Sequence, residues 1–245
     1  MSVQLTLEDV SLSFDGFKAI SNLSVAIDKG ELRAIIGPNG AGKTTMMDII
    51  TGKSRPDSGR VIWQDSLDLT PLDEAATARL GIGRKFQTPT VFETQRVEDN
   101  IALALAADRS VWATLFHQRS EDETRRITEL LTLIELEDQR NALARTLSHG
   151  QKQWLEIGML LAQDPELLLV DEPAAGMTDA ETSRTAALLR EIAGQHTVIV
   201  VEHDMEFVRA LDCRVTVLHQ GSVLAEGSLA HVSRNPEVVE VYLGR

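Results

Sequence analysis

A glycine-rich loop at residues 37–45 is the part of this chain best suited to do chemistry. Its sequence, Gly-Pro-Asn-Gly-Ala-Gly-Lys-Thr-Thr, fits the phosphate-binding pattern G-x-x-x-x-G-K-[ST]. An apolar run precedes the loop, and a helical pattern that ends at Gly52 follows it. This strand, loop and helix order is the setting that the motif requires. The alternative is a glycine-rich turn that contains Lys-Thr by chance, and the two flanking elements disfavour it.

Each residue type in the loop has a physical reason to bind a nucleoside triphosphate together with Mg²⁺. Glycines let backbone N–H groups close around phosphate oxygens, and the start of the following helix adds partial positive charge. We expect Lys43 to reach the β- and γ-phosphates and the Thr44 hydroxyl to ligate Mg²⁺. The expected ATP-binding residues of the loop are Gly37, Pro38, Asn39, Gly40, Ala41, Gly42, Lys43, Thr44 and Thr45.

Two acidic residues, Asp171 and Glu172, follow a second apolar run at residues 166–170. A continuous apolar run is typical of a buried parallel strand, and ligands of open α/β sheets bind at the carboxyl ends of such strands. We therefore expect Asp171 to hold Mg²⁺ and Glu172 to orient or deprotonate the attacking water. Alone, the pattern fits a solvated strand end equally well, and its pairing with the phosphate loop favours the catalytic interpretation.

A third motif, Leu-Ser-His-Gly-Gln at residues 147–151, precedes Asp171 by about twenty residues. With these motifs the chain resembles the ATP-binding subunit of an ABC transporter over nearly its whole length. The resemblance implies that Phe14 stacks on adenine, that Gln87 touches Mg²⁺ or water and the permease, and that His203 senses the γ-phosphate. Strand core, an ordinary loop residue and a satisfied strand-end histidine are the respective alternatives. The expected catalytic residues are thus Glu172, His203, Gln87 and Lys43, and the expected Mg²⁺ ligands are Thr44, Gln87 and Asp171.

Ser148 is predicted to be the N-cap of a helix, because apolar residues recur at helical spacing from Trp154 onward. Helix N-termini bind anions, but this one is expected to lie far from the phosphate loop of its own chain. The resemblance implies a head-to-tail dimer, in which Ser148, Gly150 and Gln151 of one subunit close over the γ-phosphate held by the other. Binding of two ATP molecules then joins the dimer, and hydrolysis releases it.

The chain departs from the family pattern at two positions. His149 stands where glycine is commonest, which relatives tolerate, and Thr178 stands where aspartate usually contacts the partner site. Asp179 is one residue too late to replace that aspartate directly. Thr178 and Glu181 also fit a capping box for the next helix, and we favour that role for Thr178, which leaves the cross-dimer contact open.

Longer stretches indicate a branch of the family. Residues 84–93, 97–101 and 171–176 resemble subunits that serve uptake of branched-chain amino acids and urea, and residues 148–158 and 176–179 are similar to urea transporter ATPases in particular. We expect the ATPase subunit of an importer for a small solute, urea first. A branched-chain amino acid importer, an exporter, a soluble ABC ATPase and a nucleotide sensor are the alternatives.

The expected partners follow from the resemblance and from the charge. The resemblance implies permease subunits, a second ATPase subunit that is identical or related, and indirectly an extracytoplasmic solute-binding protein. A net charge of −13, from 24 basic and 37 acidic residues, argues against nucleic acid as a partner and against attachment to anionic lipid. With no signal pattern and no apolar run of membrane-spanning length, we expect a peripheral position on the cytoplasmic face of the inner membrane.

The elements that must position these residues suggest one α/β domain over residues 1–245. We expect a P-loop NTPase (ABC ATPase) core with an antiparallel β subdomain, residues 1–88 and 164–245, and an inserted α-helical subdomain, residues 89–163, that carries the third motif. Pro71 fits the first position of a helix, and Ser120 fits the cap of another. Residues 90–92 are a candidate permease contact, with packing inside the insert as the alternative.

Overall fold

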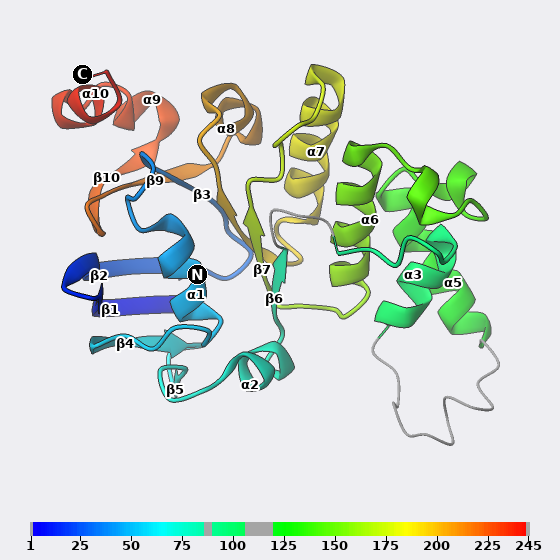
Figure 1. The fold of residues 1–245 in the computed structure, drawn as a ribbon, viewed down its shortest axis with the longest axis horizontal. Coiled ribbons are helices and arrows are strands. Elements are labelled where there is room, and N and C mark those ends of the chain that lie inside the picture. Colours follow the sequence, from blue (N-terminus) through cyan, green and yellow to red (C-terminus); the bar gives the residue numbers. More distant parts are fainter. Residues whose placement is uncertain (1, 86–89, 106–119, 244–245) are drawn as a thin grey trace.

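The structure is a computed structural model that describes residues 2–85, 90–105 and 120–243. One of its two sheets is antiparallel, and Figure 1 shows it at one end of the molecule, far from the helices α3, α5 and α6. The strand order in this sheet is β2-β1-β4-β5. Its strands are β1 (Val3–Phe14), β2 (Phe17–Asp28), β4 (Ser58–Trp63) and β5 (Leu67–Asp68).

The second sheet has the order β10-β9-β3-β8-β7-β6, and its strands run parallel except for β10, which pairs antiparallel with β9. The carboxyl ends of the parallel strands therefore meet at one edge, where ligands of such sheets bind. The strands are β3 (Leu32–Ile36), β6 (Ile82–Lys85), β7 (Leu167–Asp171), β8 (Thr197–Val201), β9 (Arg214–His219) and β10 (Ser222–Ser228).

Both faces of the parallel sheet are covered, because nearly every residue of its central strands β3, β7 and β8 is buried. In β7, Leu167 and Leu169 pack into a cluster with the antiparallel sheet and α1, whereas Leu168 and Val170 pack into a second cluster with the other helices. Successive side chains of a strand point to opposite faces. An uninterrupted apolar run thus places β7 between two layers and brings its terminal acids to the carboxyl edge.

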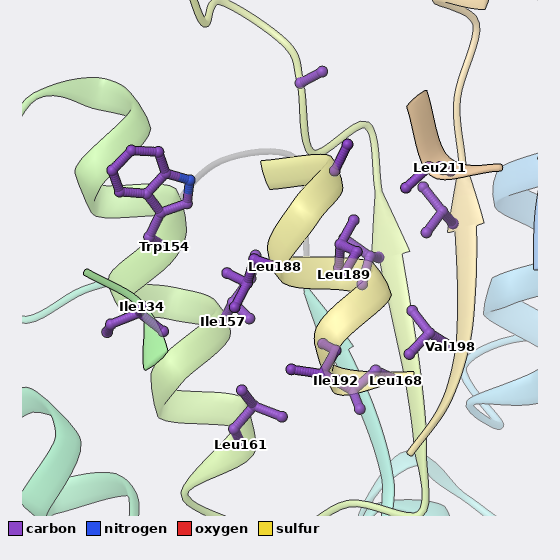
Figure 2. Close-up of a cluster of buried hydrophobic side chains, with 14 of the residues drawn as sticks. Ile134, Trp154, Ile157, Leu161, Leu168, Leu188, Leu189, Ile192, Val198 and Leu211 are labelled. Atoms are coloured by element: carbon purple, nitrogen blue, oxygen red, sulfur yellow. The ribbon is translucent and has the colours of Figure 1, made fainter. Parts of the chain in front are cut away.

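Helices cover the far face of the parallel sheet and extend away from it (Figure 1). Figure 2 shows Trp154, Ile157 and Leu161 of α6 beside Leu188 and Ile192 of α7. The Trp154 Nε1–H donates to Thr185 Oγ1 at 2.9 Å, which ties the two helices together at one more point. The helices are α1 (Lys43–Ile50), α2 (Glu74–Arg79), α3 (Val97–Ala104), α5 (Glu121–Leu133), α6 (His149–Leu161), α7 (Asp179–Ile192), α8 (Met205–Leu211), α9 (Leu229–Val232) and α10 (Pro236–Leu243), with 3-10 turns η1 (Glu137–Gln139) and η2 (Ala144–Thr146).

Three predicted helix starts are confirmed as complete capping boxes. In each, the N-cap hydroxyl accepts the backbone N–H three residues later, and the side chain there accepts the N-cap backbone N–H. The pairs are Ser120 with Glu123, Ser148 with Gln151, and Thr178 with Glu181. The cap predicted for Thr178 is therefore present, in the position where the family usually has aspartate.

Other predictions were wrong or incomplete. The helix expected at Pro71 begins at Glu74, because the Asp73 carboxylate accepts the Ala76 N–H and caps the helix there. Residues 90–96 are irregular rather than helical, and η1 and η2 interrupt the stretch between α5 and α6. Strand β6, which pairs parallel with β7, was not predicted.

Candidate active site

The phosphate loop joins β3 to α1 and folds tightly against its neighbours. Gly42 has φ 102°, which glycine adopts without strain. A Cβ added at Gly42 would lie 2.7 Å from Ile20 Cδ1 and 2.8 Å from Ala19 O. Only glycine therefore lets the loop approach β2 this closely. The α1 helix that follows has no side-chain cap among the described residues, so the backbone N–H groups of its first turn can donate to an anion.

The Lys43 ammonium lies inside this loop. Its Nζ donates to the backbone oxygens of Gly37 at 2.7 Å and Pro38 at 3.1 Å. Burial lowers the pKa of Lys43, and the nearby carboxylates of Glu172 and Asp171 act in the opposite direction. Lys43 is thus positioned to interact with phosphate groups in the loop, while the neighbouring Thr44 is exposed with its hydroxyl available.

Asp171 ends β7 with a carboxylate that is buried and only partly satisfied. Its Oδ2 lies 3.6 Å from Arg84 Nη2, and its Oδ1 has no hydrogen-bond partner within the described part of the chain. Burial raises the pKa of Asp171, and the Arg84 guanidinium lowers it. An unpaired, buried carboxylate oxygen suits a hard cation, and protein sites usually give Mg²⁺ one or two carboxylates plus phosphate oxygens. Thr44 and Asp171 therefore fit the Mg²⁺ that the motif implies.

Glu172 and His203 come from neighbouring strand ends and face each other. The Glu172 backbone N–H donates to Val201 O at 2.9 Å, which joins the ends of β7 and β8. His203 Nδ1 lies 3.6 Å from Glu172 Oε1. Glu172 has φ 44°, a left-handed conformation that costs a non-glycine residue about 1 kcal/mol or more. Such strain is common where a side chain must be aimed at a reacting group.

Sequence reasoning missed Glu202, although the residue organises this part of the site. Its buried carboxylate accepts backbone N–H groups from Ala174 at 3.1 Å, His203 at 3.0 Å and Asp204 at 3.3 Å. Burial raises the pKa of Glu202, and these three hydrogen bonds lower it. Glu202 thereby holds the loop after Glu172 against the start of α8. An acid at the end of an apolar strand was the available signal.

Phe14 lies exposed at the end of a strand. Phe14 ends β1 opposite Phe17, and 49% of its surface is exposed. The alternative of a strand-core residue is therefore wrong, and the ring is free to stack on a base. Gln87 lies outside the described residues. On either side of its segment, Lys85 and Thr90 both contact the buried carboxylate of Glu156 in α6, which sequence reasoning also missed.

The third motif forms the N-terminus of α6. Ser148 Oγ accepts the Gln151 N–H at 3.2 Å, and His149 Nε2 lies 3.2 Å from Ala175 O in the loop that follows Glu172. The structure does not bring this motif to the phosphate loop. α1 and α6 belong to clusters on opposite faces of the parallel sheet, and they are well separated in Figure 1.

Tyr242 in α10 is a further residue that sequence reasoning missed. Its buried hydroxyl has no hydrogen-bond partner among the described residues. Burial raises the pKa of Tyr242 to about 12, and the Gly37 backbone acts in the opposite direction. Tyr242, near the end of α10, therefore lies close to the backbone of Gly37, the first glycine of the phosphate loop.

Comparisons with known proteins agree with this geometry. A family model described as ABC transporter matches residues 20–175, and one described as branched-chain amino acid ATP-binding cassette transporter matches residues 222–245. The chain is 33% identical to the high-affinity branched-chain amino acid transport ATP-binding protein LivG of Escherichia coli K12, over 98% of this chain and 97% of that protein. It is 32% identical to the high-affinity branched-chain amino acid transport ATP-binding protein BraF of Pseudomonas aeruginosa, over 98% of this chain and 97% of that protein.

Solved structures are similar in fold. An ATP-binding cassette of an ABC transporter in its ADP conformation superposes with a TM-score of 0.85 and 30% identity, covering 100% of both chains. A dimeric cassette in a post-hydrolysis state, bound to ADP and phosphate, superposes with a TM-score of 0.76 and 28% identity, covering 92% of this chain and 98% of that one. In the part of the chain that the structure describes, no helix has the length and apolar character needed to cross a membrane.

Proposed function

Since the chain belongs to the ABC transporter family, as an ATP-binding subunit of the branched-chain amino acid transport type, we propose that it powers uptake of a small solute as one half of a head-to-tail ATPase pair. The chain binds ATP with Mg²⁺ and couples its hydrolysis to transport. One arrangement carries the proposal: Lys43, the Asp171 Oδ1 that has no hydrogen-bond partner among the described residues, and Glu172 facing His203 lie at the carboxyl edge of one sheet.

Each residue at this edge has a role that its surroundings support. Thr44, Asp171 and Gln87 would hold Mg²⁺, which neutralises phosphate charge when bound. Lys43 would give up the carbonyls of Gly37 and Pro38 and bind phosphate oxygens. Phe14 would stack on the adenine, and backbone N–H groups of residues 37–45 would bind phosphates. The residues of the loop in this role are Gly37, Pro38, Asn39, Gly40, Ala41, Gly42, Lys43, Thr44 and Thr45.

Glu172 would accept a proton from the attacking water, or orient that water, as its position beside the Mg²⁺ ligand allows. His203, within 3.6 Å of Glu172 Oε1, would bind the γ-phosphate and keep Glu172 inactive when the phosphate is absent. His203 is 61% exposed, so it can move between these two partners.

A second subunit would complete the site. Ser148, Gly150 and Gln151 lie too far from the phosphate loop of their own chain to act on it, so we assign them to the γ-phosphate of the partner subunit. The similar cassette that was solved as a dimer with ADP and phosphate supports this arrangement. The partner is a second copy or a related ATPase subunit.

Permease subunits would bind the inserted helical part, residues 89–163, on the cytoplasmic face of the membrane. Phe92 and Leu103 support this surface, because they are large apolar side chains with 52% and 58% of their surface exposed. An extracytoplasmic solute-binding protein would act on the chain only through the permease.

The solute is most directly suggested by the relatives, which are named for branched-chain amino acid transport. Urea is a second candidate, because the sequence of residues 148–158 and 176–179 is similar to that of urea transporter ATPases. The relatives named above lend urea no support. No residue of the chain is assigned to the solute itself, since the permease and the binding protein carry that specificity.

Uptake of labelled leucine and labelled urea separates these candidates. A source strain that lacks the chain would be complemented with the wild type or with Glu172→Gln. Restoration of leucine uptake by the wild type alone supports both the importer and the amino acid solute. Restoration of urea uptake alone keeps the mechanism and changes the solute. If neither uptake responds, the importer proposal is wrong.

A further inference from the structure

The Glu181 carboxylate connects the starts of two helices. Its Oε2 accepts the Thr178 backbone N–H at 3.0 Å and the Thr178 hydroxyl at 2.9 Å, which caps α7. Its Oε1 accepts the hydroxyl of Ser148, the N-cap of α6, at 3.1 Å. The same side chain therefore completes one cap and binds the hydroxyl at the centre of the other.

This carboxylate also lies over the first turn of α6. A Cβ added at Gly150 would be 2.5 Å from Glu181 Oε1, so the oxygen occupies the space above the glycine. The hydrogen bonds from Thr178 hold the pKa of Glu181 below its ordinary value, and the group is an anion at neutral pH. A negative charge at a helix N-terminus is favourable, and a bound phosphate would approach the same helix start.

Packing between α6 and α7 fixes the carboxylate in this position. One turn after Glu181, the Thr185 hydroxyl accepts the Trp154 indole N–H at 2.9 Å. Deeper in the interface, Ile157 and Leu188 lie side by side in Figure 2. The two helices are thus joined along their length, and their relative position cannot change without breaking a packed core.

We propose that Glu181 is a positioning residue that competes with the partner's γ-phosphate for the Ser148 hydroxyl, and so weakens closure of the ATP-bound dimer. This inference rests on the proposed role of Ser148. A serine hydroxyl has one proton to donate, and the oxygen of Ser148 already accepts the Gln151 N–H. The proton goes to Glu181 or to a phosphate oxygen, never to both.

The competition has a defined consequence for the ATPase cycle. Closure turns the Ser148 hydroxyl away from Glu181, whereas the bonds between Glu181 Oε2 and Thr178 can persist. Once phosphate has left, the hydroxyl returns to the carboxylate, which favours reopening. Glu181 therefore lowers the affinity of the composite site for ATP and leaves binding to the phosphate loop of a single chain unaffected.

Glu181→Gln tests the proposal, because glutamine also serves at the third position of a capping box, whereas the charge and one of the two acceptor oxygens are lost. The transporter complex would be purified through a tag on this chain and assayed for ATPase activity. We expect the KM for ATP to fall about two- to fivefold, the size of an exposed charge interaction, with no gain in kcat. The difference from the wild type shrinks at high salt, which a purely structural effect would not do.

Three comparisons complete the experiment. Glu191→Gln removes an exposed carboxylate from the far end of α7 and should leave the KM unchanged. Ser148→Ala should raise the KM and abolish the effect of Glu181→Gln in the double variant. Binding of a fluorescent ATP analogue to the isolated chain should be the same for the wild type and Glu181→Gln.

The outcomes separate this inference from the proposed function. If Ser148→Ala leaves the KM unchanged, the role of the third motif is wrong and the competition fails with it. If Ser148→Ala raises the KM but Glu181→Gln leaves it unchanged or raises it, the competition is wrong and the proposed function stands.

Discussion

The phosphate loop and the third motif, residues 147–151 (the Ser148 loop), each lead into a helix. The polar groups at the two helix starts find their hydrogen-bond partners in opposite ways. α1 follows Gly42, and no side chain of the described residues caps it. Beside it, the buried Oδ1 of Asp171 has no partner in the described chain. α6 follows Ser148, whose cap is complete and to which Glu181 adds a carboxylate.

This difference shows how one chain can carry two halves of a site. Among the described residues, the phosphate-loop half leaves polar groups unsatisfied, which costs stability, and a nucleotide with Mg²⁺ would satisfy them. The Ser148 half is complete without a nucleotide, because side chains of α6 and α7 already satisfy it. In the proposed dimer, the γ-phosphate held by the partner subunit would compete for the Ser148 hydroxyl. In the proposed dimer, the phosphate-loop half binds the nucleotide, and the Ser148 half contacts that nucleotide from the partner subunit.

Glu172→Gln should produce the largest effect, confined to the phosphate-loop half. Loss of a general base lowers rates by about 10²–10⁴-fold, so we expect steady-state ATP hydrolysis to fall at least about 100-fold. ATP binding should persist, and the ATP-bound dimer should accumulate, as measured by size-exclusion chromatography with ATP and Mg²⁺. Hydrolysis at the wild-type rate would contradict the role of Glu172.

Glu156→Ala tests the contact between α6, which begins at the Ser148 half, and β6, which pairs with the strand β7 that ends in Asp171. Glu156 of α6 lies 3.6 Å from the fully buried Lys85 Nζ of β6, and burial lowers the pKa of Lys85 against this carboxylate. Removing one partner of a buried ion pair costs about 3–5 kcal/mol, so chemical denaturation should show a loss of that size. The double variant Lys85→Met, Glu156→Leu should recover most of it. An unchanged denaturation midpoint for Glu156→Ala would show that the ion pair does not hold α6 to β6.

Lys43→Ala should weaken ATP binding without weakening the fold. Hydrogen bonds to charged groups contribute about 1.5–3 kcal/mol, which predicts a loss of roughly 10- to 100-fold in ATP affinity by isothermal titration. Because burial opposes the charge of Lys43, the free energy of unfolding of the apo chain should stay the same or rise. Unchanged ATP affinity, or a clear loss of stability, would place Lys43 in the fold rather than in the site.

Thr178→Ala should produce the smallest effect, and it concerns the Ser148 half, whose helix starts are already capped by side chains. Loss of an N-cap hydroxyl costs about 1 kcal/mol, measurable by denaturation, and it also removes one of the two hydrogen bonds that Glu181 Oε2 accepts from residue 178. Thr178→Ser keeps both the capping oxygen and the hydroxyl that donates to Glu181, so it should retain the stability. If Thr178→Ala is as stable as the wild type, the cap contributes nothing to the second half.

Local patterns predicted the motifs and caps because these depend on a few residues close in sequence. The capping boxes at Ser148 and Thr178 are examples, and both are present. Pro71 was a local pattern too, but the stronger cap at Asp73 moved the helix start. Strand β6, with the sequence Ile-Gly-Arg-Lys, lacks apolar alternation and owes its conformation to pairing with β7.

Contacts between distant residues could not be predicted from spacing. Ser148 meets Glu181 because two helices pack, and Glu202 accepts three backbone N–H groups because two strand ends meet. Tyr242 reaches the Gly37 backbone across most of the chain's length. Tertiary packing sets each of these contacts, so local patterns can mark a residue such as Glu202 or Glu181 but cannot name the distant group that it contacts.

The central claim is that the two halves act on each other across a dimer rather than within one chain. Two copies of the chain joined by a flexible linker, which keeps them at high effective concentration, test it directly. Lys43→Ala and Ser148→Ala would be placed in the same copy or in different copies, and ATP hydrolysis measured. The account predicts that the variants in different copies leave one composite site intact and retain activity, whereas both in one copy damage both sites. Greater activity with both variants in one copy would contradict it.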